Sequence, residues 1–149
     1  MELGLDGTVA IVTGGASNIG RAITHELGAA GATVATFDRD VDQARRTAAE
    51  VEATDGSAVV YGIDLTDLDA TQAAVAEVET GVGPVRTLVN NVGWNGTAKF
   101  FLDLEAATPL RRRPEAVDIA WTVAFLVSER ARMLTGQVLS VSGGFNMPR

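Results

Sequence analysis

A glycine-rich turn follows a short apolar run near the start of the chain, at Thr13-Gly14-Gly15-Ala16-Ser17-Asn18-Ile19-Gly20. Gly14 permits a tight turn, the small residues after it let the backbone approach a ligand, and Gly20 lets a helix pack close to a sheet. Asn18 stands where a third glycine could be expected, and asparagine adopts positive φ at modest cost. Because the turn precedes an amphipathic stretch, it is a candidate binding loop for a dinucleotide pyrophosphate. The alternative is an ordinary glycine-rich turn between a strand and a helix.

Asp38 ends the second apolar run, about 20 residues after this turn, where a carboxylate can accept hydrogen bonds from an adenosine ribose. Its negative charge would repel a 2′-phosphate, so NAD is preferred over NADP. Arg39 could bind that phosphate, which keeps NADP as the alternative. A purely local role for Asp38, capping the turn into the next helix, is also open.

The elements that must position these residues alternate between short Val-, Ile- and Thr-rich runs and longer amphipathic stretches, which is typical of an α/β, Rossmann-like doubly wound parallel sheet. We predict strands at Thr8–Thr13, Thr33–Asp38, Ala58–Gly62, Thr87–Asn90 and Gln137–Val141. We predict helices at Ile19–Ala30, Val41–Ala53, Asp67–Thr80 and Glu115–Ser128, with a further short buried helix around Phe100–Leu104. Thr66 is expected to cap the third helix, with Asp69 three residues later.

Composition excludes several classes of function. The chain has 149 residues, a formal net charge of −7 and no cysteine, so disulfides, thiolate metal sites and a cysteine nucleophile are excluded, and no metal site is expected. The negative charge disfavours nucleic acid and anionic membranes as partners. We see no targeting or membrane-spanning segment and expect a cytoplasmic protein.

Arg111, Arg112 and Arg113 are interpreted as a solvated linker, with a phosphate or acidic-partner contact as the alternative.

Five motifs in order along the chain resemble those of the short-chain dehydrogenase/reductase family: TGGASNIG at 13–20, Asp38, Asp64-Leu65, Asn90-Asn91-Val92-Gly93, and GQVLSVSGG at 136–144. The resemblance implies that Asp64 and Leu65 border the adenine and that Asn90, Asn91, Val92 and Gly93 lie beside a cofactor ribose. It implies an NAD-dependent oxidoreductase acting on a secondary alcohol or ketone. The segments Asn91–Trp94 and Leu139–Gly144 look most like those of 2-hydroxycyclohexanecarboxyl-CoA and related cyclic-alcohol dehydrogenases.

The catalytic motif that the family would use, Tyr-x-x-x-Lys assisted by a Ser and an Asn, is absent. The only tyrosine is Tyr61, and the only lysine is Lys99. A tyrosine has an ordinary pKa near 10, so acid–base work at neutral pH requires a neighbouring ammonium group. The resemblance runs from Leu3 to about Leu104 and resumes at about Thr108, so the segment that would carry the motif is missing between them.

No other residue is expected to replace that motif, and we assign no catalytic residue. His25 lies on the first crossover helix, away from the ligand edge of the sheet, and Ser17 belongs to the phosphate loop. Ser140 and Ser142 have no evident His or Lys partner, and a lone serine is a weak nucleophile. Trp94 could flank a nicotinamide or a substrate, whereas Trp121 is expected in the core or at a subunit interface.

We therefore expect one domain with the shortened strand order 3-2-1-4-7. The number 7 is the family's number for the last strand, because the family's strands 5 and 6 are missing here. This last strand is expected to pair with the edge of the fourth. Residues 1–104 form the nucleotide-binding part, 105–114 a junction, and 115–149 the final helix and strand. We also expect a homo-oligomer. The leading hypothesis is an NAD-binding oxidoreductase that is catalytically impaired. The alternatives are a non-catalytic NAD-binding or assembly module, and an incomplete record of a longer enzyme.

Overall fold

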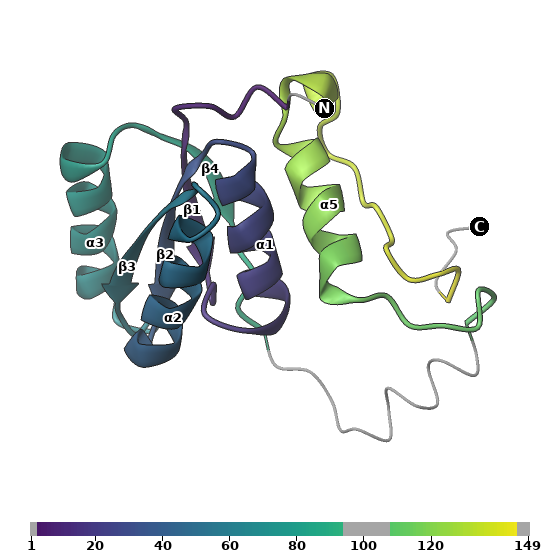
Figure 1. Cartoon of the computed structure of the whole chain (residues 1–149), viewed down its shortest axis with the longest axis horizontal. Helices are drawn as coiled ribbons and strands as arrows, with labels where there is room; N and C mark the ends of the chain where they lie inside the picture. Colours follow the sequence, from purple (N-terminus) through teal and green to yellow (C-terminus); the bar gives the residue numbers. More distant parts are fainter. Residues whose placement is uncertain (1–2, 94–107, 146–149) are drawn as a thin grey trace.

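The computed structural model describes residues 3–93 and 108–145. Four parallel strands form one sheet in the order β3-β2-β1-β4, with β1 (Val9–Thr13) and β2 (Thr33–Asp38) at its centre and β3 (Ser57–Gly62) and β4 (Val85–Val89) at its edges (Figure 1). The predicted α/β class with a parallel sheet is confirmed, and the first four predicted strands overlap the observed ones. All strands run in one direction, so their carboxyl ends meet at one edge of the sheet.

Helices cover both faces of this sheet, as Figure 1 shows. One hydrophobic cluster joins α1 (Asn18–Ala29) and α5 (Ala116–Leu126) to the side chains of Ala10, Val12 and Val34. A second cluster joins α3 (Leu68–Gly81) to the opposite face, at Val9, Ile11, Ala35 and Phe37. Neighbouring strand residues thus enter different clusters, because successive side chains of a strand point to opposite faces.

Local polar contacts fix where the helices begin. Asp40 caps α2 (Val41–Glu52) by accepting a hydrogen bond from the Gln43 amide at 3.1 Å. The predicted cap at Thr66 is wrong: Asp67 caps α3 by accepting from the Ala70 amide at 3.0 Å. The helix begins one residue later than predicted, so Thr66 lies before the N-cap, and its hydroxyl donates to Asp64 at 2.8 Å.

The predicted strand at Gln137–Val141 is not formed. Its predicted pairing with the edge of the fourth strand is therefore wrong. Packing of α5 against α1 and a hydrogen bond from the Leu110 amide to the Gly143 carbonyl fix the chain on either side of this segment. In Figure 1 the segment runs on the far side of α5 from α1, away from the sheet. Among the residues described, β4 is an edge strand.

Two further expectations concern helices. Trp121 is 56% exposed, so it does not lie in the core. The expected helix around Phe100–Leu104 lies outside the described residues, as do Trp94 and Lys99. No helix in ranges 3–93 and 108–145 combines the length and apolarity needed to cross a membrane.

Candidate nucleotide-binding site

Asn91 fastens the end of β4 to the glycine-rich loop. Its side-chain amide donates to the carbonyl oxygens of Thr13 and Gly14, each at 3.1 Å, and its backbone amide donates to the Thr13 hydroxyl at 3.0 Å. The Thr13 hydroxyl in turn donates to the Val89 carbonyl at 3.3 Å. These bonds close the loop against β4, so Asn91 shapes the site from beneath.

Two buried threonines hold the next two carbonyl groups of the loop. The Thr24 hydroxyl, on α1, lies 3.4 Å from the Gly15 carbonyl oxygen and 3.0 Å from that of Gly20. The Thr47 hydroxyl, on α2, donates to the Ala16 carbonyl at 2.9 Å. Both threonines are fully buried, at 0% exposure. Sequence reasoning missed them, although a threonine within the apolar stripe of a helix is a signal for such a bond.

The captured carbonyls decide where the loop amides point. In a trans peptide the N–H lies opposite the C=O, and no cis peptide is found among the described residues. When side chains beneath the loop bind the carbonyls of Gly14 and Ala16, the amides of the following residues, Gly15 and Ser17, are directed away from them. The loop can therefore present amide donors on its outer side.

Close packing makes glycine necessary at two positions of the loop. A Cβ atom on Gly20 would lie 2.0 Å from the Gly14 carbonyl oxygen and 2.6 Å from the Asn91 amide nitrogen. Gly14 has φ +63°, and a Cβ there would lie 3.0 Å from a Val92 methyl group. Asn18 has φ +50°, in the region that asparagine tolerates. The loop and helix can approach this closely only without side chains.

The first turn of α1 has no acidic residue and no side-chain cap of its own, because its N-cap residue Ser17 makes no side-chain capping hydrogen bond. Ser17 and Asn18 are exposed and Ile19 is half-buried, so the first turn is accessible. The positive end of the helix dipole is thus free to stabilise an anion.

Asp38 lies beside the loop as the spacing predicted, and it also helps to hold the loop. One carboxylate oxygen accepts from the Ala16 amide at 3.1 Å, and the other accepts from the Asp40 amide at 3.0 Å. A carboxylate can accept about four hydrogen bonds, so lone pairs remain for a ligand hydroxyl. The bond to Ala16 is a structural role that the spacing did not reveal.

Asp64 and Leu65 follow the carboxyl end of β3. Hydrogen bonds from the Thr66 backbone amide and hydroxyl lower the pKa of Asp64 below its usual value, and the charge of Arg39 lowers it further. Leu65 packs at the edge of the α3-side cluster. Val92 and Gly93 follow β4, and both are exposed. Every predicted cofactor-binding residue therefore lies in the glycine-rich loop, at the start of α1, or at or just after the carboxyl end of a strand.

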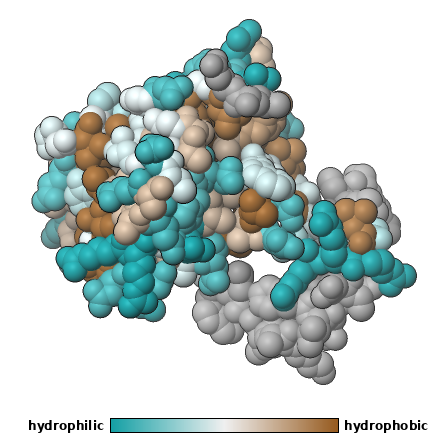
Figure 2. All heavy atoms as spheres, viewed as in Figure 1, coloured by the Kyte–Doolittle hydropathy of each residue, from teal (hydrophilic) through white to brown (hydrophobic). Residues whose placement is uncertain are grey.

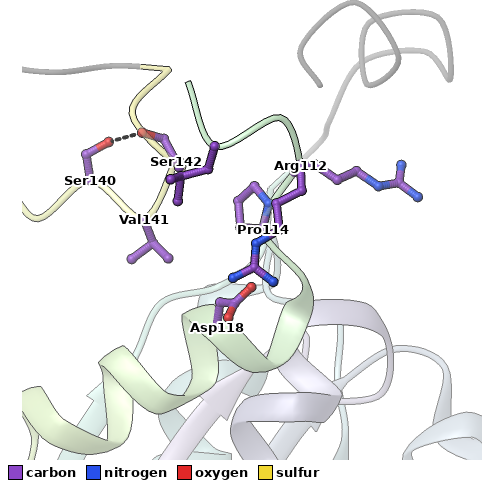
Figure 3. A pocket seen from close by; sticks show the side chains of 9 residues that line it. Arg112, Pro114, Asp118, Ser140, Val141 and Ser142 are labelled. Atoms are coloured by element: carbon purple, nitrogen blue, oxygen red, sulfur yellow. Dashed lines mark hydrogen bonds between the residues drawn. The ribbon is translucent and has the colours of Figure 1, made fainter. Parts of the chain in front are cut away.

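The other residues whose side chains could take part in catalysis lie elsewhere. Tyr61 is engaged with Phe37, with ring centroids 5.3 Å apart. His25, on α1, contacts Glu50, on α2, at 3.0 Å. Ser140 donates to Ser142 at 2.8 Å beside a separate open pocket, toward which Asp118 projects from α5 (Figure 3). No group of three or more potential metal ligands occurs within residues 3–93 and 108–145.

Comparison with known proteins identifies the family. Residues 8–134 match the model of the short chain dehydrogenase family. A short chain dehydrogenase of Pseudocercospora fijiensis is 36% identical over 135 residues, covering 91% of this chain and 40% of the relative. A 2-dehydro-3-deoxy-D-gluconate 5-dehydrogenase of Formosa agariphila is 36% identical over 124 residues, covering 83% of this chain and 45% of the relative.

The solved structure of a 7α-hydroxysteroid dehydrogenase complexed with NADH and 7-oxo glycochenodeoxycholic acid shares the fold, with a TM-score of 0.89, 21% identity and 96% coverage of each chain. This chain belongs to the short-chain dehydrogenase family. It spans less than half the length of the two curated relatives just described.

Proposed function

We propose that this chain binds NAD at the loop between β1 and α1 and that it lacks the groups for efficient alcohol or ketone turnover. The observation that carries the binding proposal is the capture of two loop carbonyls, Gly14 by Asn91 and Ala16 by Thr47. That arrangement preorganises outward amides beside an uncapped helix end, which is the chemistry a diphosphate requires.

The remaining predicted residues would hold the rest of the cofactor. Asp38 would accept hydrogen bonds from the adenosine ribose, while Asp64 and Leu65 would border the adenine. Asn91, Val92 and Gly93 would lie beside the second ribose. Because the Asp38 carboxylate would be opposite a 2′-phosphate, NAD is expected to bind more tightly than NADP. When bound, NAD would supply a hydride acceptor.

The proton-transfer half of the reaction has no evident residue. No Tyr-x-x-x-Lys sequence occurs in the chain, and the ring of Tyr61 packs against Phe37. A bound nicotinamide would therefore lack a positioned proton acceptor for a secondary alcohol. The names of the relatives, which include dehydrogenases of butanediol and of hydroxysteroids, support a secondary and in part cyclic alcohol as the ancestral substrate class.

Calorimetric titration with NAD and NADP, followed by a screen of secondary alcohols for NADH formation, tests both parts. We expect saturable binding that favours NAD, with no NADH above the enzyme-free rate. Absence of binding would reject the nucleotide site. Binding with rapid NADH formation would reject the impairment while leaving the nucleotide site intact. Intact mass of the natural protein tests the third hypothesis, because a mass well above 15.5 kDa would indicate an incomplete record.

A further inference from the structure

The segment Gln137–Val141 has the composition of an internal strand and the surroundings of a surface coil. Val138 is 93% exposed and Leu139 is 52% exposed. Adjacent residues of an extended chain point to opposite faces, so apolar residues at both positions are typical of a parallel strand covered on both sides. The chain is tied before this segment by the Glu129 amide donating to the Leu3 carbonyl, and after it by the Leu110 amide donating to the Gly143 carbonyl.

The outer edge of β4 has no strand paired with it within the described residues. Within the described part of the chain, β4 pairs only with β1, which leaves a row of backbone donors and acceptors on its other side. Leu88 is 58% exposed, although it stands in register with Ile11, which is 2% exposed. An uncovered edge of this kind is a template for pairing with another strand.

We propose that two copies of this chain associate reciprocally, with Gln137–Val141 of each copy added to the β4 edge of the other. Within one copy the two surfaces stay apart, because α5 packs on α1 and Gly143 is tied to Leu110. A two-fold axis uses each surface once per copy, so one dimer covers both edges and both strand-like segments. A single copy leaves apolar side chains exposed to solvent. Figure 2 shows hydrophobic residues among hydrophilic ones on one face of the molecule.

Charge favours a second copy as the occupant. Residues 3–93 carry 13 Asp and Glu against 5 Arg, whereas residues 108–145 carry 3 Asp and Glu against 5 Arg. The sheet-bearing part is therefore strongly negative, and the part that holds the added segment is slightly positive. Like parts of two copies repel and unlike parts attract, which favours the reciprocal arrangement over pairing of β4 with β4.

Light scattering after size-exclusion chromatography tests the proposal on the full chain over a range of protein concentrations. We expect double the chain mass of 15.5 kDa at high concentration. Leu88→Lys, which puts a charge on the β4 surface, and Val138→Pro, which removes an amide donor, should each give monomers. Two matched controls should still dimerise: Leu68→Lys, at a residue 66% exposed on α3, and Val138→Ile. A wild-type chain that stays monomeric would overturn the proposal.

Mixing the two variants separates reciprocal pairing from other dimers. A Leu88→Lys copy offers an intact Gln137–Val141 segment, and a Val138→Pro copy offers an intact β4, so the mixed dimer has one intact pairing while neither variant alone has any. Partial recovery of dimer in the mixture is expected. Dimerisation lost only with Leu88→Lys would indicate β4 against β4, and dimerisation lost only with Val138→Pro would indicate segment against segment; either result overturns the reciprocal arrangement.

A cross-linking measurement protects the test against variants that fold poorly. The chain has no cysteine, so single-cysteine chains Leu88→Cys and Val138→Cys can be mixed and oxidised. The mixed disulfide should form faster than either symmetric one. Faster formation of a symmetric disulfide would overturn the proposal.

Discussion

At the residue scale, Gly20 allows α1 to lie close to the loop. In a Gly20→Ala chain the new Cβ would meet the Gly14 carbonyl oxygen at 2.0 Å, so the helix or the loop must shift. We expect the free energy of unfolding to fall by about 1–3 kcal/mol and NAD affinity to fall with it. Urea denaturation and calorimetric titration measure the two effects.

Gly81→Ala is the matched control for that substitution. A Cβ on Gly81, the last residue of α3, would have no atom within 4 Å. Alanine also costs less conformational entropy than glycine in a helix, by about 0.5–1 kcal/mol, so this variant should be at least as stable as the wild type. Equal loss of stability in both variants would show that steric contact at Gly20 is not the cause.

Asp38 combines a bond to the loop with a proposed bond to the ribose. Asp38→Asn retains one acceptor oxygen and removes the negative charge, so we expect weaker NAD binding and a smaller preference for NAD over NADP. Titration with both cofactors measures the ratio of dissociation constants. Asp55→Asn is the control, because it removes a charge at a φ of +60° that asparagine tolerates. An unchanged ratio for Asp38→Asn would remove the ribose assignment.

At the element scale, Thr47 links α2 to the loop. Thr47→Val preserves shape but leaves the Ala16 carbonyl without its 2.9 Å hydrogen bond. Loss of a partner from a buried polar group costs about 1–3 kcal/mol of stability, and a less ordered loop should also bind NAD more weakly. Thr122→Val is the control, because the Thr122 hydroxyl donates to the Asp118 carbonyl four residues earlier in α5. Similar effects from both variants would contradict a special role for Thr47.

The contact between α1 and α2 should also depend on pH. Hydrogen bonds from His25 and then Arg21 lower the pKa of Glu50 below its ordinary value of 4.5. A carboxylate whose pKa is lowered by folding stabilises the folded state above its unfolded-state pKa, and that contribution is lost as the pH falls through the folded-state value. The stability of the wild type should therefore decline below pH 4.5.

Glu50→Gln should show a shallower decline over that acidic range, as measured by urea denaturation at successive pH values. Glu52→Gln removes a charge from the end of the same helix and serves as the control. Parallel pH profiles for the wild type and Glu50→Gln would contradict this assignment.

At the scale of the whole molecule, α5 attaches the carboxyl-terminal part of the chain to the sheet-bearing part. Ala120 and Ala124 are 0% and 3% exposed in the cluster shared with α1. Ala120→Leu would overfill this contact and cost about 1–3 kcal/mol, so residues after α5 should become more open to protease. Limited proteolysis measures this, with Trp121→Gln as the exposed control. Equal cleavage of both variants would contradict the attachment.

The sequence by itself determined the alternation of strands and helices, the positions of the first four strands and the residues of the glycine-rich loop. These features depend on local properties: hydrophobic period, the conformational freedom of glycine, and a carboxylate at a fixed distance along the chain. The missing tyrosine–lysine pair was also a matter of sequence alone. A cap at Thr66 was predicted wrongly because Asp64, Thr66 and Asp67 all offer polar side chains within four residues, and competition among them depends on the turn geometry.

Only the tertiary structure decided what holds the loop and where the last segment lies. Thr24 and Thr47 stand 4 and 27 residues after Gly20, and nothing in their local sequence specifies that both reach loop carbonyls. Gln137–Val141 has the pattern of a strand, yet a strand exists only where a neighbouring edge is within hydrogen-bonding distance. The packing of α5 on α1 sets that distance, and such packing joins residues nearly a hundred positions apart, beyond the reach of any local pattern.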